Sequence, residues 1–124
     1  MIMRLSDVYN TAAALISESP AGSDNEDLRR RAPFLLSGII TELKPLDDAK
    51  NGREKYGDYV FDSLDADFPL CAELAPVCAC KLAYLLAADE NTVLYQVLKT
   101  EYEEAKRSFA ASIPAAVHKI KNVY

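Results

Sequence analysis

The sequence predicts an all-α fold, with one compact bundle of about four helices around a central apolar helix at about 69–88. Apolar residues recur at three- and four-residue steps through most of the chain, which is helical periodicity. Positions 68–88 carry only two charged residues, so neighbours should cover this segment on several sides. The 124 residues suffice for one core. We therefore expect a single helical domain at 1–114 and an extended C-terminal tail at 115–124.

The first helix is expected to begin at Ser6, whose side chain can cap free backbone amides. Asp7 then places a negative charge near the positive end of the helix dipole. The apolar face continues to Ile16, and the residues from Ser19 to Gly22 are expected to form a turn.

The second helix should follow a capping box formed by Ser23 and Glu26. Pro33 interrupts it, and because the apolar phase continues, the sequence predicts a kink or a one-turn break. Gly38 weakens the helix and suggests a close approach of a second helix. Lys44 followed by Pro45 is expected to end the element.

The basic cluster Arg29–Arg31 lies on this second helix. It has two interpretations: a contact for an anion or acidic partner, or a solvated face balanced by Glu26 and Asp27.

Between positions 45 and 67 the periodicity dissolves, which predicts a long irregular loop. The loop is rich in aspartate, but the spacing of a calcium-binding loop is absent. A solvated loop facing a partner is the better interpretation. Its aromatic residues Tyr56, Tyr59 and Phe61 are candidate partner contacts.

The central helix is expected to start at Pro69, a residue suited to the first helical position, and to kink at Pro76. Asn91 or Thr92 should cap a fourth, amphipathic helix that Pro114 ends. One side of that helix is lined by Val93, Leu94, Val97, Leu98, Tyr102, Ala105 and Phe109. In the tail, Ile120, Val123 and Tyr124 are candidate contacts to the same chain or a neighbour.

No sequence motif for chemistry is present: there is no P-loop, GxGxxG, HExxH or GxSxG. The three cysteines lie close together on a helix, where their spacing disfavours a bridge, so we expect reduced core thiols. His118 is distant from them, so neither a metal nor a cofactor is expected. The net charge of −5 disfavours tight binding to a phosphate backbone.

Several segments together resemble a known family. They read SLDADFPLCAELAPVCACKLAYLLAADE, YEEAKRSF and a terminal KIKNVY, after a helix bearing RAPFLLSGIITEL. The chain is similar in this pattern to the small helical head–tail connector (adaptor, or head-completion) proteins of tailed phages and prophages. The three cysteines of the central helix depart from the usual pattern.

The resemblance implies a non-enzymatic subunit of a ring that joins the portal to the tail, with genome DNA passing through its centre. Its partners would be other copies of itself and the portal and tail proteins, without a membrane. It would be made in the cytoplasm of the host bacterium and become a virion component. An acidic loop facing the channel would repel phosphates and let DNA slide. Its candidate residues are Asp47, Asp48, Asp62, Asp65 and Asp67.

Two alternatives remain at this point. The first is a small helical adaptor or regulatory module that binds a protein partner in a groove beside the central helix. The second is a small enzyme with a site in the loop, which would need perturbed carboxylates such as Asp65 and Asp67 in a closed pocket.

Overall fold

The chain folds into a bundle of helices, as the periodicity predicts. The computed structural model describes residues 3–16, 26–51, 60–88 and 92–113. These contain α1 (Leu5–Leu15), α2 (Glu26–Asn51), a 3₁₀ turn η2 (Ala72–Leu74), α3 (Ala75–Ala87) and α4 (Thr92–Ala111). Within these ranges there is no β-strand, only an isolated antiparallel bridge between Arg4 and Asp67. No described helix is long and apolar enough to cross a membrane.

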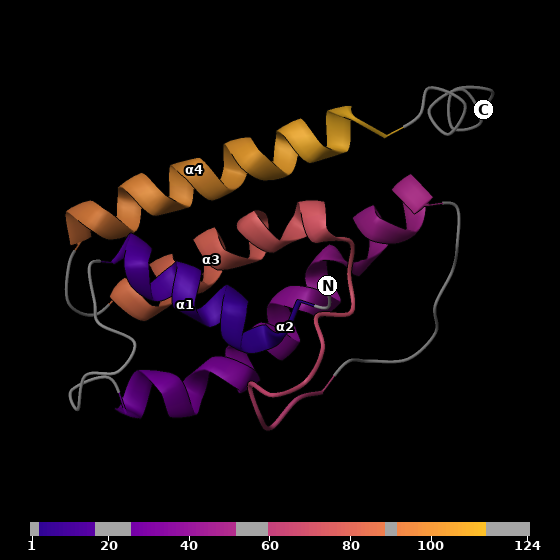
Figure 1. Cartoon of the computed structure of the whole chain (residues 1–124). Helices are drawn as coiled ribbons and strands as arrows, with labels where there is room; N and C mark the ends of the chain where they lie inside the picture. The colour runs from indigo at the N-terminus through magenta and orange to yellow at the C-terminus, as the bar shows by residue number, and fades with distance from the viewer. Residues whose placement is uncertain (1–2, 17–25, 52–59, 89–91, 114–124) are drawn as a thin grey trace.

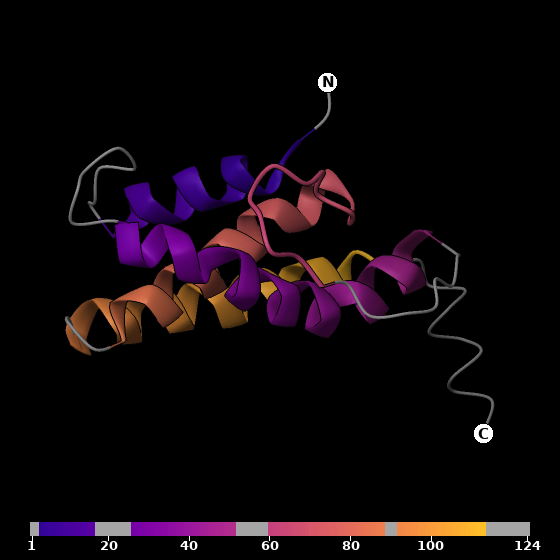
Figure 2. The same cartoon turned by 90° about the horizontal axis from the view of Figure 1, so that it is seen from below.

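Helix α3 is the centre of the bundle, which confirms the predicted central apolar helix. It packs against α4, α1 and α2, and Figures 1 and 2 show it between α1 and α4. Val77, Cys78 and Leu82 are almost completely buried, and Ala79 and Ala83 let neighbouring helices approach closely. Burying a leucine such as Leu82 contributes roughly 1.5–3 kcal/mol. The core is therefore built around this helix.

The start of α3 differs from the sequence prediction. The helix begins at Ala75 after the 3₁₀ turn, not at Pro69. Pro76 consequently lies in the first turn, where its missing N–H would have no intrahelical partner. The predicted kink at Pro76 is wrong for this reason.

Helix α2 runs without a break from Glu26 to Asn51, through both Pro33 and Pro45. Its predicted end at Lys44 and the start of the loop at position 45 are therefore wrong, because the helix extends to Asn51. A proline in a helix interior costs about 3 kcal/mol. The last turns are held in place because Asp47 is buried and Lys50 donates to the carboxylate of Glu73 at 2.5 Å. Tertiary contacts thus override the local stop signal.

The free backbone N–H groups at the start of α1 donate to carbonyl oxygens of a segment far along the chain. The N–H of Leu5 donates to the carbonyl of Ala66 and the N–H of Ser6 to that of Leu64, both at 2.9 Å. The N-cap is Arg4, whose own N–H donates to the Asp7 carboxylate at 2.9 Å. The prediction that Ser6 starts the helix is therefore wrong by two positions.

Candidate interaction surfaces

Five predicted contact residues lie outside the described part of the chain. They are Tyr56, Tyr59, Ile120, Val123 and Tyr124. Phe61 is described and is half-buried, packed against the core. Its N–H donates to the hydroxyl of Ser37 at 2.8 Å, which ties this segment to α2. The neighbouring Val60 is the exposed apolar residue here, with 79% of its surface accessible.

The acidic residues predicted to face a channel divide into two groups. Asp47 lies in α2 and is only 1% exposed, and one of its carboxylate oxygens accepts the N–H of Cys71 at 3.2 Å. Asp48, also in α2, forms an ion pair with Lys44 at 3.0 Å. Asp47 is therefore a core residue and not part of an acidic surface. Asp62, Asp65 and Asp67 are exposed in the segment that follows position 60.

A charged cleft of about 400 Å³ lies between the first turns of α2 and residues 62–65. One wall is formed by Arg29, Arg30, Pro33 and Phe34, and the other by Asp62, Ser63, Leu64 and Asp65. Its size falls in the range of ligand-binding pockets. Phe34 is 60% exposed at this cleft, so an aromatic ring faces solvent among charged groups.

The arginines of the basic cluster Arg29–Arg31 are differently engaged, and of the three only Arg29 and Arg30 line the cleft. Arg31 forms an ion pair with Asp27 at 3.3 Å, and Arg29 lies over the ring of Tyr9 at 5.5 Å from its centroid. Among the described residues, Arg30, Asp62 and Asp65 make no ion pair, although all three line the same cleft. The cleft thus offers unpaired charges of both signs.

Helix α4 carries two exposed valines one turn apart. Val93 is 75% and Val97 49% exposed. Of the residues predicted to line one side of this helix, these two are therefore not part of its buried stripe. The buried stripe is instead carried by Leu98, Tyr102 and Phe109. Val93 and Val97 form a separate apolar strip on the surface.

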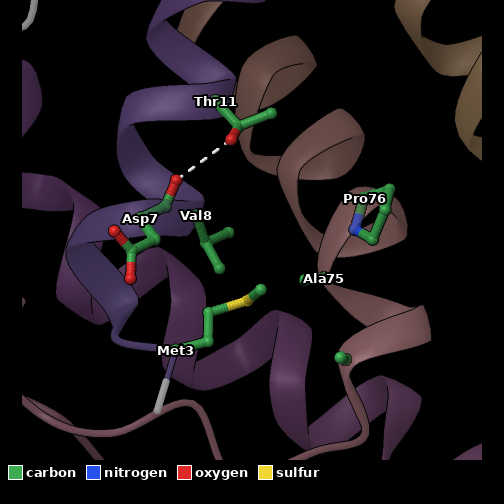
Figure 3. Close-up of a pocket in the computed structure, with 7 residues that line it drawn as sticks. Met3, Asp7, Val8, Thr11, Ala75 and Pro76 are labelled. Atoms are coloured by element: carbon green, nitrogen blue, oxygen red, sulfur yellow. Dashed lines mark hydrogen bonds between the residues drawn. The ribbon is translucent and has the colours of Figure 1, made fainter. Parts of the chain in front are cut away.

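A small, mostly apolar pocket of about 190 Å³ lies between α1 and the start of α3. Met3, Val8, Ala72, Ala75 and Pro76 line it, with Asp7 and Thr11 at one side. In Figure 3 the Met3 side chain points toward the space between Val8 and Ala75, and the Thr11 hydroxyl donates to the Asp7 carbonyl. A cavity of roughly 150 Å³ holds a benzene ring, so this pocket has room for one side chain.

A polar cluster joins three helices. Glu42 of α2 accepts hydrogen bonds from Lys81 of α3 and from the hydroxyl of Tyr102 of α4, both at 2.6 Å. Burial acts to raise the pKa of Glu42, but these hydrogen bonds and the Lys81 charge outweigh it and leave the pKa lowered. Burial and the Glu42 carboxylate together raise the pKa of Tyr102. The cluster fixes the packing of the three helices.

The three cysteines are free thiols. Burial, followed by the contact with Asp47, raises the pKa of Cys71, and burial with a smaller effect of Glu101 raises that of Cys80. Burial raises the pKa of Cys78 to about 12. All three are therefore protonated near neutral pH and serve as small packing residues. No group of three metal-binding side chains occurs among the described residues.

The surface features that sequence reasoning missed are Phe34, Val60 and the strip of Val93 and Val97. The sequence pattern could have revealed Phe34, Val93 and Val97 as surface residues. The core stripe of α2 passes through Ala32, Leu36, Ile39, Ile40 and Leu43. Phe34 is out of phase with that stripe, and the two valines are one position ahead of Leu94 and Leu98.

Comparison of the chain with protein-family models, with characterised proteins and with solved structures finds no match.

Proposed function

We propose that this chain is a non-enzymatic structural subunit of a phage or prophage head–tail connector ring that joins the portal to the tail. The observation that carries the protein-binding part of this proposal is the set of exposed large apolar side chains. Phe34, Val60, Val93 and Val97 are exposed, outside the buried core that the described residues form. Of these, Val93 and Val97 are one turn apart on α4, and an exposed apolar strip of this kind suits a contact with another protein.

The groups whose pKa values are shifted support a structural role for the chain. Glu42 and Tyr102 use their polar atoms to hold α2, α3 and α4 together. Cys78 is completely buried in the core. Catalytic groups with displaced pKa values are usually arranged in a cleft that a substrate can enter. In the described residues these groups instead serve helix packing.

Two observations support a connector ring in particular: the sequence pattern and the distribution of acidic groups. Asp62, Asp65 and Asp67 are exposed on one segment. Facing a channel, they would repel the phosphates of passing DNA, which favours sliding over binding. Asp47 is excluded from this role by its burial.

The proposal is tested by mixing the purified chain with the portal protein of the same phage genome. Mass photometry should show the chain joining the portal as a multi-copy assembly, and the assembly should survive size-exclusion chromatography. The variant Val93→Lys with Val97→Lys changes two exposed side chains, so it should keep the core and assemble less than the unmodified chain. A chain that stays monomeric at all portal concentrations would contradict the proposal.

The apolar pocket of Figure 3 favours a second candidate, an adaptor module that binds a protein partner. Its position beside the start of α3 suits the insertion of one apolar side chain of a partner. The two functions differ in stoichiometry, because an adaptor forms a discrete complex of defined small size. Native mass spectrometry of the complex distinguishes them.

A further inference from the structure

We propose that the charged cleft is the receptor for the C-terminal segment 114–124 of a second copy of this chain. The inference rests on the proposed ring assembly and names the contact that links its subunits. Arg29, Arg30, Pro33 and Phe34 form one wall of the receptor, and residues 62–65 form the other.

The two walls of the cleft match a segment that has two different faces. In an extended segment, successive side chains point to opposite sides. Lys119 and Lys121 would then share one side, and Ile120 and Tyr124 the other. The lysines would face Asp62 and Asp65, which have no ion pair in the described part of the chain.

The other face of the segment fits the α2 wall. Ile120 and Tyr124 would pack on the ring of Phe34, which is 60% exposed beside the buried Pro33. The guanidinium of Arg30, which has no ion pair among the described residues, can lie over the ring of Tyr124. Aromatic and arginine side chains of this kind carry much of the binding energy in protein interfaces.

The last described residues of α4 lie far from the cleft of the same chain. The hydroxyl of Ser112, at the end of α4, accepts a hydrogen bond from Lys50 at 3.2 Å, so position 113 lies near the last turn of α2. Phe34 lies sixteen residues earlier on α2, about 24 Å along the helix axis. Figures 1 and 2 show the start of α2 and the end of α4 at opposite ends of the bundle.

This separation favours a second copy as the donor of the segment. Residues 114–120 span at most about 23–25 Å when fully extended. In its own chain Ile120 would reach Phe34 only with every residue stretched along α2. Between two copies, the end of α4 of one meets the start of α2 of the next without such stretching. A contact between two different patches is heterologous and closes into a ring when the rotation between copies permits it.

The test uses charge reversal in the full-length chain, followed by analytical ultracentrifugation. Lys119→Glu with Lys121→Glu, and separately Asp62→Lys with Asp65→Lys, should each weaken self-association by about tenfold or more. The matched control reverses two exposed acids of α4, Glu103→Lys with Glu104→Lys, and should leave self-association unchanged. An equal loss in this control would overturn the proposal, because net charge would then explain the effect.

Mixing the two charge-reversed proteins shows whether the segment docks on a second copy or on its own chain. Each mixture partner supplies the segment that matches the other's cleft, so association should return to the level of the unmodified chain. A further variant carries all four changes, at positions 62, 65, 119 and 121, in one chain. If association is restored in this variant and not in the mixture, the segment docks within its own chain and the proposal is overturned. No restoration in either arrangement would show that the cleft is not the receptor.

A second measurement applies even where association is weak. The chain with Tyr124→p-benzoylphenylalanine is mixed with isotope-labelled chain at high concentration and irradiated. Mass spectrometry should find cross-links from position 124 to residues 29–34 or 60–65 of the labelled copy. Cross-links elsewhere, or none between copies, would overturn this inference. If rings form on the portal but the cross-links lie elsewhere, this inference fails and the proposed function stands. If the chain does not assemble with the portal at all, the proposed function fails.

Discussion

The carboxylate of Asp47 accepts a hydrogen bond from the backbone N–H of Cys71 at 3.2 Å, and this contact fixes the last turns of α2 to the segment that leads into α3. The contact crosses 24 positions of sequence. It explains why an acidic residue just after a proline lies in the core and not in a loop.

Asp47→Ala should lower the free energy of unfolding by about 1–3 kcal/mol, because the N–H of Cys71 loses its acceptor. Asp47→Asn keeps an acceptor oxygen and should cost less. Urea denaturation measures both, with the exposed Asp65→Ala as a control that should change stability by less than about 0.5 kcal/mol. Equal stability of Asp47→Ala and the unmodified chain would show that the contact is unimportant.

Gly38→Ala should stabilise the protein by roughly 0.5–1 kcal/mol. Gly38 lies in the interior of α2 and is exposed, and a Cβ atom built on it meets nothing within 4 Å. The suggestion that Gly38 marks a close approach of another helix is therefore wrong. Thermal unfolding of the variant measures the change, and a decrease in stability would contradict this account of α2.

The stability of the protein should depend on pH through Glu42. Its pKa in the folded chain lies below the ordinary value of 4.5, so its contribution is present above about pH 4.5 and is lost as the pH falls through the lowered value. Glu42→Gln lacks this titration. The difference in unfolding free energy between the two proteins should shrink from pH 7 toward pH 3, and a constant difference would contradict the assigned role.

Cys78 should resist alkylation in the native protein and react once the chain is unfolded. Its side chain is completely buried, and burial raises its pKa to about 12, so almost no thiolate forms at pH 8. Iodoacetamide treatment with and without urea, followed by mass spectrometry, measures the difference. Half-buried Cys71 and Cys80 are the internal comparison and should react sooner. Rapid native labelling of Cys78 would contradict the packing of α3.

Val93→Ser with Val97→Ser should leave the unfolding free energy within about 0.5 kcal/mol while weakening assembly with the portal. Both side chains are exposed, so the core loses nothing. The buried Leu98→Ala, one position further on, is the matched contrast and should cost about 2–5 kcal/mol in stability. If the valine variant were strongly destabilised, the strip would belong to the core.

The structure confirms the predicted helical fold and its central helix. Both could be predicted because burial of one face of a helix requires apolar residues at three- and four-residue steps. Leu74, Cys78 and Leu82 were recognisable in this way. The ends of elements were harder to predict, because local signals compete with distant contacts. Pro45 reads as a stop, yet α2 continues since Asp47 and Lys50 have partners far along the chain.

The surface features were only partly accessible to sequence reasoning. Phe34 can be found as an aromatic residue outside the core stripe. Its position opposite Asp62 and Asp65 depends on how residues 60–68 run along the bundle. That path is set by backbone bonds from Leu5 and Ser6, which no side-chain pattern reveals. The cleft therefore required the structure.

The most direct test of the central claim is electron microscopy of the chain incubated with its portal protein. The proposed function predicts a closed ring of repeated copies of this bundle on the portal, with the apolar strip of Val93 and Val97 or the cleft at Phe34 in contact with a neighbouring protein. A bare portal, or a single copy bound to another kind of partner, would contradict it.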